Sequence, residues 1–150
     1  MRESEVMDEK VLREFLFKEV ELAQNAIERM GNNSFLIKGA AITLVAASLL
    51  IEGKLCASFV ALLPWFMFWY LDAYFLRIER LYRKLYSWLA ANRLTSEEFL
   101  LDMDRNSLEK RFGKDVDCLS QTMFSKTLII FYSMLLIMIL LSILVQGLVL

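Results

Sequence analysis

The residues that follow Lys126 constrain this chain more than any other feature. Residues 127–150 form a run of 24 positions without a single Asp, Glu, Lys or Arg. A helix that crosses the hydrocarbon core of a bilayer needs about 20 predominantly apolar residues. The 150-residue chain is also 57% hydrophobic, whereas a soluble domain is roughly 45–50% apolar. The sequence therefore predicts an all-α integral membrane protein with a modest cytoplasmic part.

Two further apolar segments precede this run. The first covers about residues 35–51 and is interrupted only by Lys38, which can extend toward the headgroups. The second covers roughly residues 55–76 and contains Pro64, which is expected to kink a helix unless a neighbour satisfies the freed carbonyl. Only three residues separate the two segments, so we expect a tight transmembrane hairpin. The alternative is a buried hydrophobic pair of helices in a soluble protein.

These segments divide the chain into four parts. We expect a cytoplasmic amphipathic helix at 1–33, a transmembrane hairpin at 34–76, a cytoplasmic helical stalk and loop at 77–126, and a third transmembrane helix at 127–150. Lys and Arg are concentrated before the first span and between the second and third. The positive-inside rule then places the N-terminus in the cytoplasm and residue 150 outside. The location we expect is the bacterial inner membrane, with residue 150 in the periplasm. The acidic N-terminus is not typical of a secretory signal peptide.

The two cytoplasmic helices carry opposite charge. Residues 3–30 place apolar side chains at helical spacing, and residues 1–30 contain eight acids against five bases. Gly31, Asn32 and Asn33 are expected to end this helix before an N-cap at Ser34. The helix leaving the second span carries a heptad seam of Leu71, Tyr74, Ile78, Leu81, Leu85 and Trp88. Its basic juxtamembrane residues are Arg77, Arg80, Arg83 and Lys84. The two helices are expected to dock antiparallel or to assemble between subunits, while the basic residues alternatively serve as headgroup anchors.

The segment after this stalk has helix-start and helix-stop signals. Thr95 and Glu98 are spaced as a capping box, which predicts a short helix beginning there. A second short helix is expected from Ser107 to Phe112, ending at Gly113. The alternating Asp102 and Asp104 lack the spacing of a calcium loop, so we expect a solvated loop and no metal site.

Two charges lie well inside the predicted spans. Lys38 is one turn from the cytoplasmic start of the first span, and Asp72 is one turn from the cytoplasmic end of the second. Because the hairpin is antiparallel, both lie at similar depth. An intramembrane ionisable pair indicates either a functional site or a salt bridge that locks the hairpin, and simple extension to the headgroups is a third explanation.

Small residues recur every four positions on the first span, at Gly39, Thr43 and Ala47. Small side chains let helix backbones approach closely in lipid. The partner of this face is either the second span or another subunit. Aromatic residues crowd the cytoplasmic half of the second span and are typical of an interfacial belt.

The composition excludes several functional classes. The chain has no His, its two cysteines are far apart in sequence, and its five glycines form no phosphate-binding loop. The net charge of −1 gives no general attraction to nucleic acid. We therefore expect no enzyme activity, no cofactor, no metal and no nucleic-acid partner.

Three stretches resemble one group of proteins. NNSFLIKGAAITLVAA (32–47), FWYLDAYFLRIERLYRKLY (68–86) and FSKTLIIFYSMLL (124–136) are similar to a widespread, uncharacterised group of small bacterial membrane proteins with three transmembrane helices. Some members are encoded near anti-phage defence or mobile-element genes. The resemblance implies this architecture and a bacterial origin, and it brings no activity with it.

Together these patterns favour a homo-oligomeric membrane effector or channel-like protein, gated through its cytoplasmic helices, with phage defence as the setting that the resemblance implies. The alternative is a membrane-anchored adaptor or regulatory subunit that recruits a soluble cytoplasmic partner. The channel-like hypothesis predicts that the purified protein conducts ions in liposomes, and the adaptor hypothesis predicts that it does not.

Overall fold

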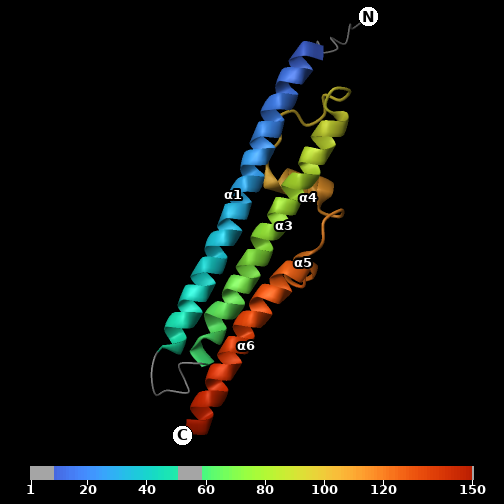
Figure 1. Cartoon of the computed structure of the whole chain (residues 1–150). Coiled ribbons are helices and arrows are strands. Elements are labelled where there is room, and N and C mark those ends of the chain that lie inside the picture. Colours follow the sequence, from blue (N-terminus) through green and yellow to red (C-terminus); the bar gives the residue numbers. More distant parts are fainter. Residues whose placement is uncertain (1–8, 51–58, 150) are drawn as a thin grey trace, which may run out of the picture. The chain divides into compact units, whose positions relative to one another are not determined.

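The computed structural model describes residues 9–50 and 59–149, and every regular element in them is a helix. The long helices are α1 (Glu9–Leu49), α3 (Leu62–Asn92) and α6 (Lys126–Val149), and the short ones are α4 (Arg105–Phe112) and α5 (Leu119–Met123), as labelled in Figure 1. The all-helical fold expected from the sequence is confirmed for this part of the chain. The expected hairpin turn at Glu52, Gly53 and Lys54 lies outside the described residues.

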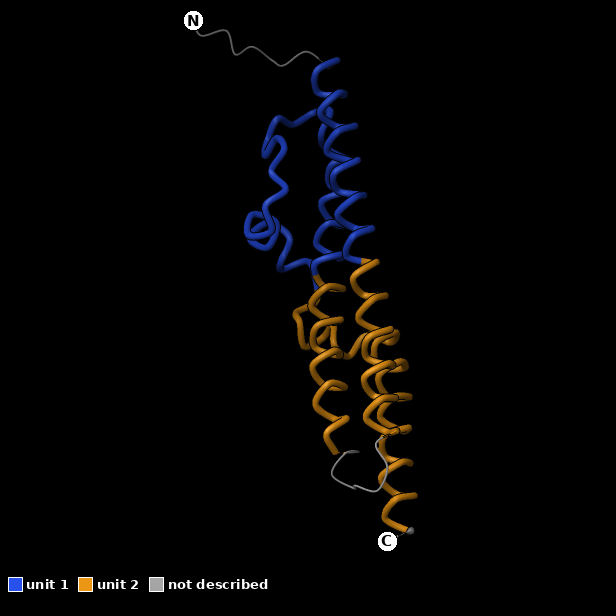
Figure 2. The backbone as a smooth tube through the Cα atoms, turned by 90° about the vertical axis from the view of Figure 1, so that its left-hand side faces the viewer, with its two compact units in different colours: residues 1–30, 78–116 blue, residues 31–77, 117–150 orange. Residues whose placement is uncertain are grey.

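The chain divides into two compact units, which Figure 2 colours separately. Unit 1 contains residues 1–30 and 78–116, and unit 2 contains residues 31–77 and 117–150. Each unit therefore combines segments that are distant in sequence. Residues 77–126 were expected as one cytoplasmic stalk and loop. In the structure they are divided between the two units, because residues 78–116 belong to unit 1 and α5 belongs to unit 2.

The prediction that the N-terminal helix ends after residue 30 is wrong. α1 continues through Gly31, Asn32 and Asn33 without interruption. A glycine inside a helix costs about 1 kcal/mol relative to alanine, which a long packed helix tolerates. Ser34 does not cap a new helix either, because its hydroxyl bonds a side chain on α3.

One helix of the described residues is long and apolar enough to cross a membrane by length and composition. It covers Lys126–Leu148, with a mean hydropathy of 3.0, and only 22% of it is buried inside the protein. The core helix of a soluble protein would be mostly buried. The described parts of the segments expected as the first two spans, 35–50 and 59–76, do not meet this criterion, so three transmembrane helices are not supported by helix length and apolarity.

In unit 2, the C-terminal part of α1, the N-terminal part of α3 and α6 lie side by side (Figure 1). Their core contains Ala41, Ala73, Leu128, Tyr132 and Leu135, with a second cluster of Val45, Ala61 and Ile139. Pro64 lies in the first turn of α3, where the missing N–H is harmless, so the expected kink has no cause there.

In unit 1, the N-terminal part of α1 packs against the C-terminal part of α3. The α3 seam is centred on buried Ile78, Leu81, Leu85 and Leu89, so the last seam position is Leu89 and not the half-buried Trp88. On α1 the buried positions include Leu12, Glu19, Ala23 and Ala26.

The helix expected at Thr95 does not form. Residues 94–104 make turns, with the Ser96 hydroxyl accepting a hydrogen bond from the Glu98 N–H. The next helix is α4, where the Asp104 carboxylate caps the N–H groups of Asn106 and Ser107. Its end at Gly113 agrees with the sequence-based expectation.

Candidate functional site

A buried carboxylate connects the three helices of unit 2. Asp72 on α3 is fully buried, and its Oδ2 lies 2.7 Å from Nζ of Lys38 on α1. Its Oδ1 accepts a hydrogen bond of 2.5 Å from the Ser34 hydroxyl, and the Lys38 ammonium also donates to that hydroxyl at 2.6 Å. The structure thus brings together the two charges that the sequence places at matching depth.

The third helix reaches this cluster through Tyr132. Its hydroxyl lies 3.1 Å from the Phe68 carbonyl and 3.3 Å from Asp72 Oδ2, so its single proton is offered to two acceptors on α3. The indole of Trp65 donates to the Tyr132 carbonyl at 2.7 Å, and that of Trp69 to the Met123 carbonyl at 3.0 Å. Sequence reasoning missed Ser34 and Tyr132 as partners, although Ser34 lies four residues before Lys38 on the same helix face.

Every polar atom of this cluster has a partner in the same chain. The ammonium beside Asp72 supplies the compensating charge that a buried carboxylate needs. The Lys38 side chain is 23% exposed and Ser34 is half-buried, so these two members of the cluster reach the surface of the unit, whereas Asp72 does not. Chemically this arrangement is an ion pair between α1 and α3, to which α6 is joined by the Tyr132 hydroxyl. Across the described ranges, no three His, Cys, Asp or Glu side chains are grouped as metal ligands.

The small residues of α1 lie on a different face of that helix. Gly39, Thr43 and Ala47 are all exposed, and a Cβ added to Gly39 would meet no atom of the chain within 4 Å. The Thr43 hydroxyl bonds the Gly39 carbonyl at 2.9 Å, so it needs no partner elsewhere. The stripe therefore does not contact the second segment of the hairpin in the described residues.

Unit 1 contains a second buried ion pair that the sequence analysis did not identify. Arg93 on α3 and Glu19 on α1 are each about 1% exposed and meet in a two-pronged contact, with Nε–Oε2 at 2.5 Å and Nη2–Oε1 at 2.9 Å. The remaining guanidinium donors bond the carbonyls of Ser96, Glu98 and Phe99 at 2.7–3.3 Å. Glu19 in turn accepts the Leu101 N–H at 2.6 Å.

This pair determines the path of the loop after α3. Phe99 and Leu101 have φ angles of 56° and 55°, in the left-handed region that residues other than glycine rarely adopt. The contacts of Phe99 O with Arg93 and of Leu101 N with Glu19 hold both residues there. The only sequence signal was weak: Glu19 shares the buried face with Leu12, Ala23 and Ala26, which makes it a charge among core positions.

Arg111 on α4 packs against the same loop, the one that follows α3. Its guanidinium carbon lies 3.8 Å from the ring centroid of Phe99, 4.7 Å from that of Trp88 and 5.0 Å from that of Phe112. Burial lowers the pKa of Arg111 from its usual value, and the charge of Asp102 opposes that effect. Trp88 also lies 5.1 Å from the Arg93 guanidinium, so this expected seam residue serves as a platform for two arginines.

The predicted basic residues have different surroundings. Arg77 Nε bonds the Asp117 carbonyl at 3.1 Å, Arg83 pairs with Glu79 one turn away at 2.7 Å, Arg80 is half-buried and Lys84 is exposed. Of the other seam positions, Leu71 and Tyr74 are half-buried in unit 2. Cys118 is exposed, and the hydroxyl of Ser120 lowers the pKa of its thiol.

Comparison with known proteins returns no family model, no curated protein and no solved structure that matches this chain.

Proposed function

We propose that this chain is a three-span membrane protein that assembles as a homo-oligomer and acts as a membrane effector under the control of its cytoplasmic helices. The observation that carries the proposal is the exposed stripe of small residues on α1, Gly39, Thr43 and Ala47, which no residue in the described ranges covers. The expected bacterial inner-membrane location and the link to phage defence follow from the sequence resemblance and the charge pattern, and they stay predictions.

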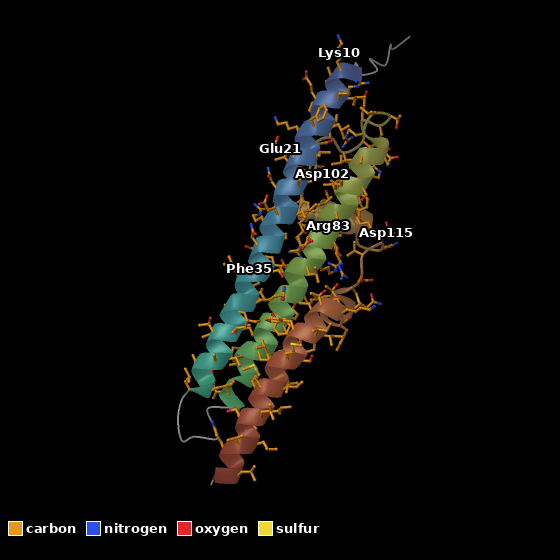
Figure 3. The ribbon with its side chains drawn as sticks, viewed as in Figure 1. Lys10, Glu21, Phe35, Arg83, Asp102 and Asp115 are labelled. Carbon is orange, nitrogen blue, oxygen red and sulfur yellow. The ribbon has the colours of Figure 1, made fainter. Side chains whose placement is uncertain are left out.

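The surface of unit 2 supports three spans. Around α6, the other two helices also expose large apolar side chains, among them Phe35 at 76% on α1, which Figure 3 labels, and Leu63, Phe66 and Met67 on α3. Such continuous apolar surface is costly in water and costs nothing in lipid. The Asp72 carboxylate, by contrast, is buried inside the unit, where Lys38 and Tyr132 contact it. If α6 lies in a bilayer, the two helices packed on it belong there as well.

The small-residue face supports association between copies. Lipid tails are as apolar as leucine, so helices associate in bilayers through close backbone packing, for which Gly, Ala and Thr are suited. The ion pair within each chain is already satisfied, so assembly does not depend on exchanging charges between chains. Ion conduction, if present, then requires several copies, because three helices of one chain pack around a filled core.

The oligomeric state tests this proposal. Gly39→Leu places a bulky side chain on the small face, at a position where an added Cβ meets no atom of another described segment within 4 Å. We expect it to weaken self-association in liposomes by at least about tenfold, equivalent to about 1.4 kcal/mol, measured by energy transfer between labelled copies. Gly147→Leu on α6 is the matched control, since its site is equally open within the chain. A monomeric wild-type protein, or equal association of both variants, contradicts the proposal.

The number of spans has a separate test. A topology reporter at Gly53 is expected to be outside, and one near Arg105 inside, because three spans place the hairpin turn opposite the long loop. With α6 as a single span, both reporters stay on one side. Position 53 therefore distinguishes the two architectures, and a cytoplasmic reading there rejects the three-span proposal.

A second candidate function is a membrane-anchored adaptor. The specific observation is that unit 1 is a separately packed helical body with its own buried ion pair and an open groove of about 520 Å³. The groove is lined by Gln24, Ile27, Glu28, Arg83, Tyr86 and Ser87. Ion flux through liposomes that contain the purified oligomer favours the effector, and an oligomer without flux favours the adaptor.

A further inference from the structure

A groove on the outer surface of unit 2 is lined entirely by carbon. It has a volume of about 350 Å³, within the range of small-molecule sites, about 300–1,000 Å³. Trp65 and Trp69 of α3 form one wall, and Ile129, Ser133 and Leu136 of α6 form the other, with Phe124 at one end. Both indole N–H groups are bonded to backbone carbonyls inside the unit, which leaves only the ring surfaces toward the groove.

The aromatic walls are held in place by one another. Trp65 and Trp69 have ring centroids 5.3 Å apart, and Phe124 meets Trp69 edge-on at 5.7 Å. Trp69 also stacks on Tyr132 with 25° between the ring planes, and Tyr132 reaches the Asp72 cluster through its hydroxyl. The groove is therefore a built feature of the unit and shares a wall with the ion pair.

A positive charge lies at the end of the same face. Lys126 is the first residue of α6, and positions 126, 129, 133 and 136 fall on one side of a helix. A cation at a helix N-terminus adds to the positive end of the helix dipole, an arrangement that is unfavourable unless an anion is close. Lys126 is exposed, and Phe124, two residues before it and 64% exposed, contacts Trp69.

We propose that this groove binds one anionic phospholipid, with an acyl chain along Trp65 and Trp69 and the phosphate group at Lys126. The charge at one end and the carbon lining along the rest match the two parts of such a lipid. The site rests on the membrane location of α6 in the proposed function and not on oligomer formation. Because Tyr132 lines the groove and its hydroxyl bonds Asp72, the bound lipid lies against α3 and α6 next to the Asp72 cluster.

Tryptophan quenching by brominated lipids tests this site. The full-length protein carries Trp88→Phe in every arm, so that Trp65 and Trp69 supply the signal, and is placed in phosphatidylcholine bilayers containing either brominated phosphatidylglycerol or brominated phosphatidylcholine. We expect phosphatidylglycerol to compete about fivefold better for the site, the effect of one Lys beside an anionic lipid. Lys126→Gln is expected to bring this preference close to one, and Lys126→Arg to retain it.

A second set of variants fills the groove with a larger side chain. Ser133→Phe is expected to abolish the preference, while Met134→Phe, at an exposed position beside the groove, retains it. Equal quenching by both lipids, or a preference that survives Lys126→Gln or Ser133→Phe, overturns the lipid site and leaves the membrane location intact. No quenching by either lipid overturns both, since the two tryptophans are then outside the bilayer.

Discussion

Lys38→Met is expected to destabilise the protein by about 3–5 kcal/mol, the usual cost of removing one partner from a buried ion pair. The substitution leaves Asp72 charged and fully buried, with only hydroxyl groups of Ser34 and Tyr132 as partners. Asp72→Asn is expected to cost less, because the Lys38 side chain that it leaves is 23% exposed and can extend toward the headgroups. Unfolding of the purified protein in mixed micelles measures both free energies.

The double variant Lys38→Met with Asp72→Asn is the control for this asymmetry. It removes both charges and keeps an amide that can bond Ser34 and Tyr132, so it is expected to recover most of the stability lost in Lys38→Met. A double-variant cycle then gives the coupling between the two positions. If Lys38→Met is as stable as the wild type, the pair contributes nothing and the 2.7 Å contact has no energetic role.

The two ion pairs differ in how visible they are in sequence. Lys38 and Asp72 stand out because each interrupts an apolar segment, and an antiparallel hairpin places them at the same depth. Glu19 and Arg93 lie 74 residues apart among many other charges, on helices that look like solvent-exposed amphipathic helices. Charge sign alone predicts that these helices attract, and it cannot select which acid and which base become buried.

Helix-start and helix-stop signals led to wrong predictions where contacts between distant residues compete with them. Thr95 and Glu98 have capping-box spacing, but Arg93 binds the carbonyls of Ser96, Glu98 and Phe99, which fixes a turn where a helix was expected. Gly31 is a common helix terminator, but in this chain the helix continues because both sides of it are packed, in unit 1 and in unit 2. The long helices, by contrast, were predictable: α6 from its unbroken apolar run and α3 from a heptad pattern that extends over several turns.

Arg93→Met is expected to have the largest effect on unit 1, about 3–5 kcal/mol, because it leaves the Glu19 carboxylate buried without its cation. It also removes the donors that hold three loop carbonyls, so amide exchange across residues 96–103 is expected to accelerate along with global unfolding. Arg93→Lys is expected to rescue little, since a single ammonium cannot make the two-pronged contact and reach the loop at once.

Arg83→Met is the matched control for Arg93→Met, because Arg83 is a second arginine on α3. Arg83 also pairs with a glutamate, Glu79, at 2.7 Å, but its side chain is 63% exposed. Surface pairs contribute about 0–1 kcal/mol, because water competes for the contact. Glu79 is 14% exposed, whereas Glu19 is about 1% exposed, so only Glu19 is left fully buried when its arginine is removed. Arg83→Met is therefore expected to stay within about 1 kcal/mol of the wild type and to leave loop exchange unchanged. Equal effects of Arg83→Met and Arg93→Met would mean that burial of the Glu19–Arg93 pair does not determine the stability of unit 1.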